Sequence, residues 1–251
     1  MRCRIDHRPA LFCLLAVFLS TGAGRGGAAQ GPSGDFTAQT RTTISGMGAS
    51  DSTATEYFGG SAMRTRTEGG DDSIIRFDEK RILTLDHRAG TYSEVTFDQL
   101  RAMLDRAGEA LEGHGEEMET VKKMMGLAEM SITVAEAGPG ETIAGYPTAK
   151  YLLRGPMEIE IHAATDLRIP PAYYDMMKLR APDNPLLDMR QLIDEMKKID
   201  GLPLKTVTTM KMMNMEMKTT RVVTSIERGA IPPSVFEIPA GYRRVEADRE
   251  E

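Results

Sequence analysis

Hydrophobic and polar residues alternate over much of the first hundred positions. From Phe36 to Ile44 apolar residues alternate with threonines, and residues 54–67 continue this β-rich composition. Three short runs follow in DDSIIRFDEKRILTLDHRAGTYSEVTF, separated by polar turns at 78–80 and 86–90. A period of two is typical of strands that bury one face. The pattern therefore predicts an antiparallel meander.

The period becomes that of a helix after Phe97. Thr96 and Gln99 form a capping box before this helix, and Gly113 ends it. A second helix is predicted over residues 116–125, with glutamates at its start and lysines at its end. The apolar faces of the two helices are formed by Leu100, Met103, Leu104, Ala107 and Leu111, and by Met118, Val121, Met124 and Met125.

A later helix lies between further strands. Asn184 is its predicted cap, Pro185 its first residue and Gly201 its end. Its inward residues are Leu186, Met189, Leu192, Ile193, Met196 and Ile199. The flanking strands are predicted at 131–135, 149–154, 157–163, 204–210, 212–220 and 222–226.

The order of these elements favours one domain. A chain that leaves a sheet for helices and then returns to it predicts a sheet covered by helices. No internal repeat and no domain boundary interrupts the pattern. The sequence therefore predicts a single α+β domain over residues 35–245. Its strongly curved antiparallel sheet would be an open half-barrel with helices covering the concave face.

The first 29 residues have the pattern of a signal peptide. Arg2, Arg4 and Arg8 precede an apolar run at 10–19, and small residues follow. This run is about half the ~20 residues that a spanning helix needs, so no stable membrane anchor is expected. Cleavage is predicted after Ala29, with Ala23 as the alternative. Residues 30–34 are then a flexible leader and 246–251 an acidic tail.

Charge and cysteine content restrict the partners. Both cysteines fall inside the predicted signal peptide, so the mature chain would have no disulfide and no thiolate ligand. The formal net charge of the whole chain is −6, and loss of the signal peptide makes it more acidic. We therefore expect no nucleic-acid partner, and a periplasmic or secreted location.

No motif indicates catalysis, and we expect neither an enzyme nor a cofactor. Gly140 and Gly145 have phosphate-loop spacing, but Tyr146 replaces the required lysine. His87 is interpreted as a solvated turn residue and His114 as part of a charged loop. His162 is predicted to share the wet face of a strand with two glutamates at 158 and 160.

The stretch TMKMMNMEMK, residues 209–218, is unusually rich in methionine. In a strand Met213, Met215 and Met217 share one face and Met210 and Met212 the other, unless a tight bend follows residue 212. Three interpretations stay open: plain core, the adaptable wall of an apolar ligand cavity, or a Cu(I) site. The Cu(I) ligands would be Met213, Met215 and Met217.

The cavity interpretation defines a set of candidate ligand-binding residues. They share apolar character and a predicted position on the covering helices or the methionine-rich strand. They are Leu100, Met103, Leu104, Met118, Val121, Met124, Met189, Ile193, Met196, Met213, Met215 and Met217.

Several segments carry a family resemblance. They are Ile74–Asp78 and Lys80–Asp86 with Tyr92, Glu141–Tyr146 before the strand Lys150–Arg154, Gly201–Leu204, and Phe236–Tyr242. Together they resemble a family of bacterial envelope proteins known only as a domain of unknown function and related to the LolA/LolB lipoprotein carriers. The resemblance implies an open, curved antiparallel sheet with helices across its mouth, a cavity that in the carriers shelters acyl chains. No position matches a known functional residue of those carriers.

These observations predict a periplasmic, non-catalytic binding protein that shelters a lipid or another apolar ligand. One alternative is a methionine-rich periplasmic Cu(I)-binding protein. Another is an envelope stress or assembly protein that acts through contacts with a protein partner.

Overall fold

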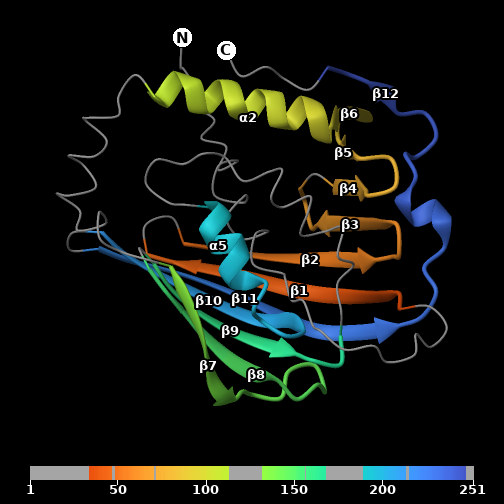
Figure 1. Ribbon diagram of the computed structural model, residues 1–251. Helices are drawn as coiled ribbons and strands as arrows, with labels where there is room; N and C mark the ends of the chain where they lie inside the picture. Colours follow the sequence, from red (N-terminus) through yellow and green to blue (C-terminus); the bar gives the residue numbers. More distant parts are fainter. Residues whose placement is uncertain are drawn as a thin grey trace, which may run out of the picture.

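The computed structural model describes residues 34–46, 49–70, 72–112, 132–155, 157–167, 189–212 and 215–246. In this part of the chain one sheet of twelve strands dominates (Figure 1). The first six strands are β1 (Phe36–Ser45), β2 (Ser50–Phe58), β3 (Ala62–Thr67), β4 (Asp72–Arg76), β5 (Arg81–Asp86) and β6 (Thr91–Thr96). The others are β7 (Thr133–Pro139), β8 (Ala149–Arg154), β9 (Glu158–Ala164), β10 (Leu202–Met212), β11 (Met215–Arg228) and β12 (Arg243–Arg244).

The sheet is open, with β12 at one end and β7 at the other. Its order is β12-β6-β5-β4-β3-β2-β1-β11-β10-β9-β8-β7. Consecutive strands pair antiparallel from β1 to β6, as the alternating pattern predicted, and from β7 to β11, and β12 adds to β6 in parallel. The long pairing of β1 with β11 joins the two meanders into one sheet. This pairing connects positions almost 200 residues apart, so local pattern alone does not reveal it.

Two α-helices occur in the described residues. The helix α2 (Phe97–Glu112) begins directly after β6, and its predicted capping box is confirmed. Gln99 N–H donates to Thr96 Oγ1 at 3.1 Å, and Thr96 N–H donates to Gln99 Oε1 at 2.9 Å. The helix α5 (Met189–Met196) is followed by a turn to Gly201, whose φ of +101° suits glycine. The predicted helix at 116–125 lies outside the described residues.

The predicted fold class is wrong. The described chain is mostly β, with a twelve-stranded sheet and two helices, and not an α+β domain with helices covering the concave face. The curved antiparallel sheet itself is present (Figure 1). The error has a physical origin: an apolar stripe shows that a helix buries one face, but not how much of a sheet it covers.

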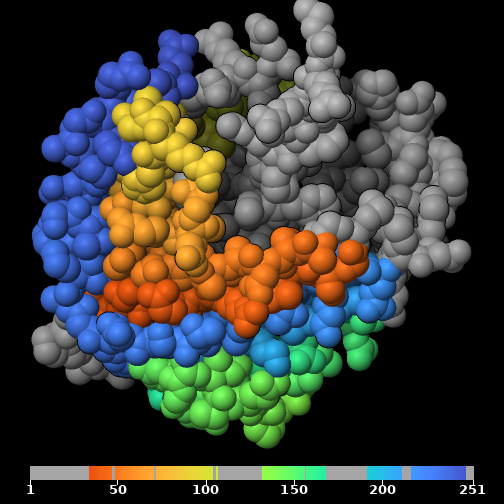
Figure 2. Space-filling view, turned by 180° about the vertical axis from the view of Figure 1, so that it is seen from behind, coloured from red at the N-terminus to blue at the C-terminus, as the bar shows by residue number. Residues whose placement is uncertain are grey.

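The sheet has two faces with different cores. We call the face that carries α5 the inner face. Its buried apolar residues join Leu192, Ile193 and Met196 of α5 in one large cluster. On the opposite, outer face a smaller cluster holds Ile74 and Leu85 beneath the C-terminal segment, which includes the short 3-10 turn η1 (Pro233–Phe236). Figure 2 shows this segment, in dark blue, running along the strands of the first meander.

Neither described helix is both long and apolar enough to cross a membrane.

Candidate functional site

The inner face of the sheet is apolar on both sides of the β1–β11 junction. Alternation places one residue in two on this face, and register aligns them across the strands. Most of them are 5 % exposed or less. The main ones are Phe36, Ala38, Phe58, Met63, Ile75, Tyr151, Leu153, Ile159, Ile161, Leu204 and Val223. Phe36 stacks on Phe58 at 4.4 Å between ring centroids.

A polar group interrupts this apolar surface. Glu56 on β2 and Arg221 on β11 form an ion pair in which Arg221 Nη2 lies 2.5 Å from Glu56 Oε2. Their side chains are only 8 % and 5 % exposed. Removing both charges from water is costly, and the attraction within the pair offsets that cost only in part.

Buried threonines accompany the ion pair. Thr206 lies opposite Arg221 in the β10–β11 register, and Thr208 lies two residues further along the same face. Thr40 on β1 donates its hydroxyl to the Ala54 carbonyl at 3.3 Å. Two polar atoms of this group have no hydrogen-bond partner among the described residues, Arg221 Nη1 and Thr208 Oγ1. Most buried polar atoms do have a partner, so these two need an explanation.

The methionine-rich stretch forms a hairpin. Strand β10 ends at Met212 and β11 begins at Met215, so the tight bend considered from the sequence is present. Met210 pairs with Met217, and Met212 with Met215. Direct antiparallel partners share a face, and the parity along β11 places Met217 on the face of Arg221. Both Met210 and Met217 are half-buried.

The described candidate ligand-binding residues lie in different surroundings. Ile193 and Met196 are each 1 % exposed in the inner core, and Leu100 packs against that core. Met103 is 43 % exposed on α2. For Leu104, Met189 and Met215 only the backbone is described. The remaining candidates lie outside the described residues, namely Met118, Val121, Met124 and Met213.

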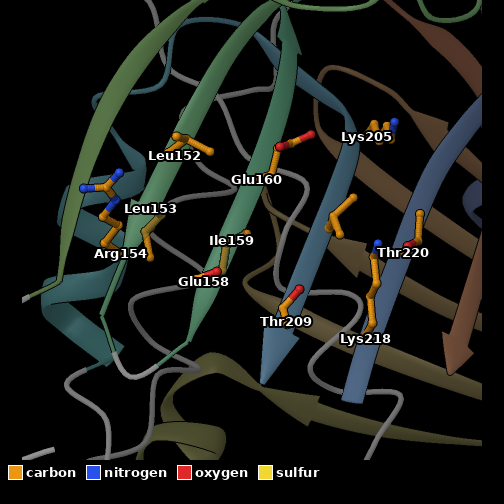
Figure 3. A pocket seen from close by; sticks show the side chains of 11 residues that line it. Leu152, Leu153, Arg154, Glu158, Ile159, Glu160, Lys205, Thr209, Lys218 and Thr220 are labelled. Carbon is orange, nitrogen blue, oxygen red and sulfur yellow. The ribbon is translucent and has the colours of Figure 1, made fainter. Parts of the chain in front are cut away.

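A hollow lies on the outer face. It is an open groove of about 590 Å³ across β8, β9, β10 and β11 (Figure 3). Its lining is mostly polar, with Glu158, Glu160, Lys205 and Lys218 among the side chains that Figure 3 labels. Because it mixes both signs of charge and is open to water, it does not suit an apolar ligand.

Charges beside the outer groove are paired. Lys150 Nζ lies 2.6 Å from Glu160 Oε2, and His162 Nε2 lies 2.9 Å from Glu160 Oε1. These hydrogen bonds, from Lys150 first and His162 second, lower the pKa of Glu160 to about 2. Lys205 likewise holds the pKa of Glu141 below its usual value. Ion pairs thus line the groove.

His162 differs from its predicted role. Glu158, Glu160 and His162 do share one face, but His162 is only 3 % exposed and not part of a wet surface. Its Nδ1 accepts the Glu141 N–H at 3.2 Å, so Nε2 carries the proton donated to Glu160. A Cβ at Gly140 would lie 2.7 Å from Nδ1. The glycine that suggested a phosphate loop is therefore needed for close packing.

A second buried ion cluster, on the outer face, has no signal in the sequence. Asp72 is fully buried, and its Oδ2 accepts from Arg64 Nε at 2.9 Å, Arg66 Nε at 3.1 Å and His87 Nε2 at 3.0 Å. Burial raises the pKa of Asp72, but hydrogen bonds from Arg64, His87 and Arg66 outweigh it and the pKa lies below its usual value. His87 lies in a turn as predicted, yet it has partners.

His87 also connects this cluster to the C-terminal segment. Its Nδ1 lies 2.5 Å from the Tyr242 hydroxyl. Arg64 Nη1 donates to the Val235 carbonyl at 2.7 Å, and Arg76 Nη1 to the Phe236 carbonyl at 3.1 Å. The partners are up to 171 residues apart in the sequence, so no local motif could have indicated them. In the described residues no group of three His, Cys, Asp or Glu side chains is placed to hold a metal.

The fold and the site together define a class: an open, mostly β protein with an apolar inner face and a buried ion pair within it. The chain belongs to the family described as domain of unknown function (DUF4412), whose model matches residues 39–242. The predicted resemblance to a family of unknown function is thereby confirmed. A search of curated proteins finds no match.

Two solved structures show weak likeness. One is PNGF-II, with 13% sequence identity and a TM-score of 0.39, covering 85% of this chain and 31% of that one. The chain therefore spans less than a third of PNGF-II. The other is the LolA superfamily protein NE2245 from Nitrosomonas europaea, with 5% identity and a TM-score of 0.34, covering 83% of this chain and 92% of that one. Both TM-scores are low, and neither likeness carries an argument about function.

Proposed function

We propose that this chain is an exported, non-catalytic binding protein that shelters an apolar ligand against the inner face of its sheet. The observation that supports this most is the continuity of the inner face. Apolar residues of both meanders form one cluster there, and the two end strands β12 and β7 are not paired with each other. Sites for apolar ligands are concave, with a few polar groups among apolar ones.

Burial of an apolar chain supplies enough free energy for binding, although each contact is weak. Each methylene removed from water contributes about 0.8 kcal/mol. A ligand that buries about ten methylenes would therefore gain about 8 kcal/mol before the cost of ordering it. The proposed ligand class is a lipid or a similar apolar molecule, and an acyl chain is its simplest form.

The first test is native mass spectrometry. The full chain is exported to a bacterial periplasm and purified without detergent. Its mass is then measured before and after organic extraction. The expected result is a bound mass of several hundred daltons that extraction removes. Protein that is bare in every preparation, and that takes up no added fatty acid, would contradict the proposal and favour a role through protein contacts.

A pair of variants separates binding from folding. Met217→Asp places a charge on the inner face near the hairpin, whereas Thr220→Asp places one on the outer groove of the same strand. The first should lower the bound fraction severalfold and the second should not, while circular dichroism stays unchanged for both. Loss of folding in Met217→Asp alone would show that the methionine is plain core.

A second candidate is Cu(I) binding by the methionine hairpin. The specific observation in its favour is the register, which sets two methionine pairs next to each other on β10 and β11. Thioethers are soft ligands that suit Cu(I). An aliquot treated with Cu(I) under reducing conditions tests it: one bound copper, lost when Met210 and Met217 are changed to leucine, would support a metal site. Under the lipid proposal the leucine variants keep their ligand.

A further inference from the structure

We infer that Arg221 and Thr208 bind an uncharged carbonyl group of the ligand, so that the protein selects carbonyl-bearing chains, such as esters, over both plain hydrocarbons and anions. This inference rests on the proposed function and specifies its ligand class. It places one polar position, formed by Arg221 and Thr208, among the apolar residues of the inner face.

The first step is the position of the two unpartnered atoms. Arg221 and Thr208 are 4 % and 5 % exposed and occupy neighbouring strands on one face. Thr206, the direct partner of Arg221, is two residues from Thr208 on that face. Arg221 Nη1 is a donor and Thr208 Oγ1 is a donor or acceptor, and neither has a partner in the described part of the chain. Leaving such a buried atom unpaired is unfavourable, because it has lost its hydrogen bond to water without gaining another.

The second step is the surroundings. The next residues on this face beyond the pair are Leu204 and Val223, both at most 2 % exposed in the inner core. In the opposite direction lie Met210 and Met217. A ligand on this surface would therefore meet apolar side chains on both sides of one polar position.

The third step decides the charge of the bound group. Glu56 already balances the positive charge of Arg221, at 2.5 Å. An anion at Nη1 would leave one net negative charge in a buried place, which is costly in a low dielectric. A neutral carbonyl oxygen accepts the same hydrogen bonds without that cost. A hydrocarbon would leave both atoms unpaired.

Unpartnered atoms elsewhere do not support a ligand in the same way. Among the described residues Asp72 Oδ1 and Arg81 Nε also lack a hydrogen-bond partner, and Arg76 Nε has only the Asp78 carboxylate at 3.7 Å. These residues, however, belong to ion clusters with several partners each, and Arg76 and Arg81 are partly exposed. Arg221 and Thr208 differ because they lie together within an apolar surface.

The test compares three ligands of similar length. Displacement of the apolar dye N-phenyl-1-naphthylamine from the full mature chain is measured with methyl decanoate, decanoate and dodecane. The expected result is that methyl decanoate binds at least about tenfold more tightly than the other two, which corresponds to about 1.4 kcal/mol. Equal binding of all three overturns this inference and leaves the proposed function standing. Tighter binding of decanoate overturns it in favour of an anion site. No displacement by any of them refutes the proposed function itself.

Two threonine variants provide the control. Thr208→Val removes an unpartnered hydroxyl, so it should leave stability equal or higher while lowering methyl decanoate affinity about threefold to tenfold and dodecane affinity not at all. Thr40→Val removes a hydroxyl on the same face that has a partner, and it should lower stability without changing the ester preference. An unchanged ester preference in Thr208→Val overturns the assignment of Thr208.

Discussion

The two faces of the sheet each bury an arginine–carboxylate pair, and the pairs differ in what surrounds them. On the outer face Arg64 uses Nε and Nη2 on Asp72 and Nη1 on the Val235 carbonyl, so its donors are engaged. On the inner face Arg221 has Glu56 as its ion-pair partner, and Nη1 has none in the described residues.

The difference indicates two roles for the same chemistry. The outer pair holds two distant parts of the chain together, since Arg64 reaches η1 and Asp72 reaches the turn at His87. Such a connected cluster constrains the C-terminal segment. The inner pair connects β2 to β11 in a sheet that β1 already joins, so it adds little to the architecture. The carbonyl site proposed above would give this costly pair a function.

The largest expected effect comes from breaking the outer pair. Asp72→Asn leaves Arg64 buried without its counter-charge, and loss of one partner of a buried pair typically costs about 3–5 kcal/mol. Urea denaturation measures the free energy of unfolding. The control is Asp51→Asn in the exposed pair Arg41–Asp51, which should leave the free energy of unfolding almost unchanged because water screens that pair. If both variants lower the free energy of unfolding equally, the Asp72 cluster does not stabilise the fold more than an exposed pair does.

Replacing both partners sharpens the contrast. The double variant Glu56→Met with Arg221→Met removes an isolated pair, so its stability should lie within about 1 kcal/mol of the parent or above it. Arg64→Met with Asp72→Leu should cost at least about 2 kcal/mol, because Val235, Arg66 and His87 lose hydrogen bonds. If the inner double variant is as damaging as the outer one, the inner pair is structural.

The sequence allowed most strands of the two meanders, the hairpin turns and the capping box to be predicted, because each depends on neighbours a few residues apart. The alternation at 36–44 and the bend after Met212 are examples. The predicted division into strands at 212–220 and 222–226 is wrong, since β11 runs unbroken from Met215 to Arg228. The pairing of β1 with β11 and the contacts of Asp72 and Arg221 depend on residues far apart in the chain. The helical periodicity showed which face of each helix is apolar. It did not show how large the sheet is or how much of it the helices cover, and so the predicted fold class was wrong.

Lowering the pH tests the outer face through a smaller effect. The pKa of Glu160 is lowered in the folded state to about 2 from a usual value of 4.5, and the pKa of Asp72 is lowered too. A lowered pKa contributes stability that is present above the unfolded pKa and is lost as pH falls through the folded one. Stability should therefore fall between about pH 4.5 and 2.

A glutamine variant of Glu160 shows how much of this loss of stability at low pH comes from that residue. Glu160→Gln should flatten the pH dependence of the free energy of unfolding in that window by no more than about 1 kcal/mol, since Glu160 is one-third exposed and screened by water. Glu158→Gln, on the same face of the same strand, is the matched variant for the removal of a carboxylate. An identical slope for Glu160→Gln and the parent would contradict the lowered pKa of Glu160.

The smallest effect concerns the link between His87 and Tyr242. Tyr242→Phe removes one hydrogen bond of a partly exposed pair and should cost about 0.5–1.5 kcal/mol. The loss should be local, because Tyr242 directly precedes β12, whose two residues add to β6. Hydrogen exchange would show it: the Val245 N–H, bonded to the Tyr92 carbonyl at 2.8 Å, should exchange faster, while amides of β10 and β11 keep their rates. Faster exchange across both faces would mean that the C-terminal segment supports the whole sheet, and that the two faces are not independent.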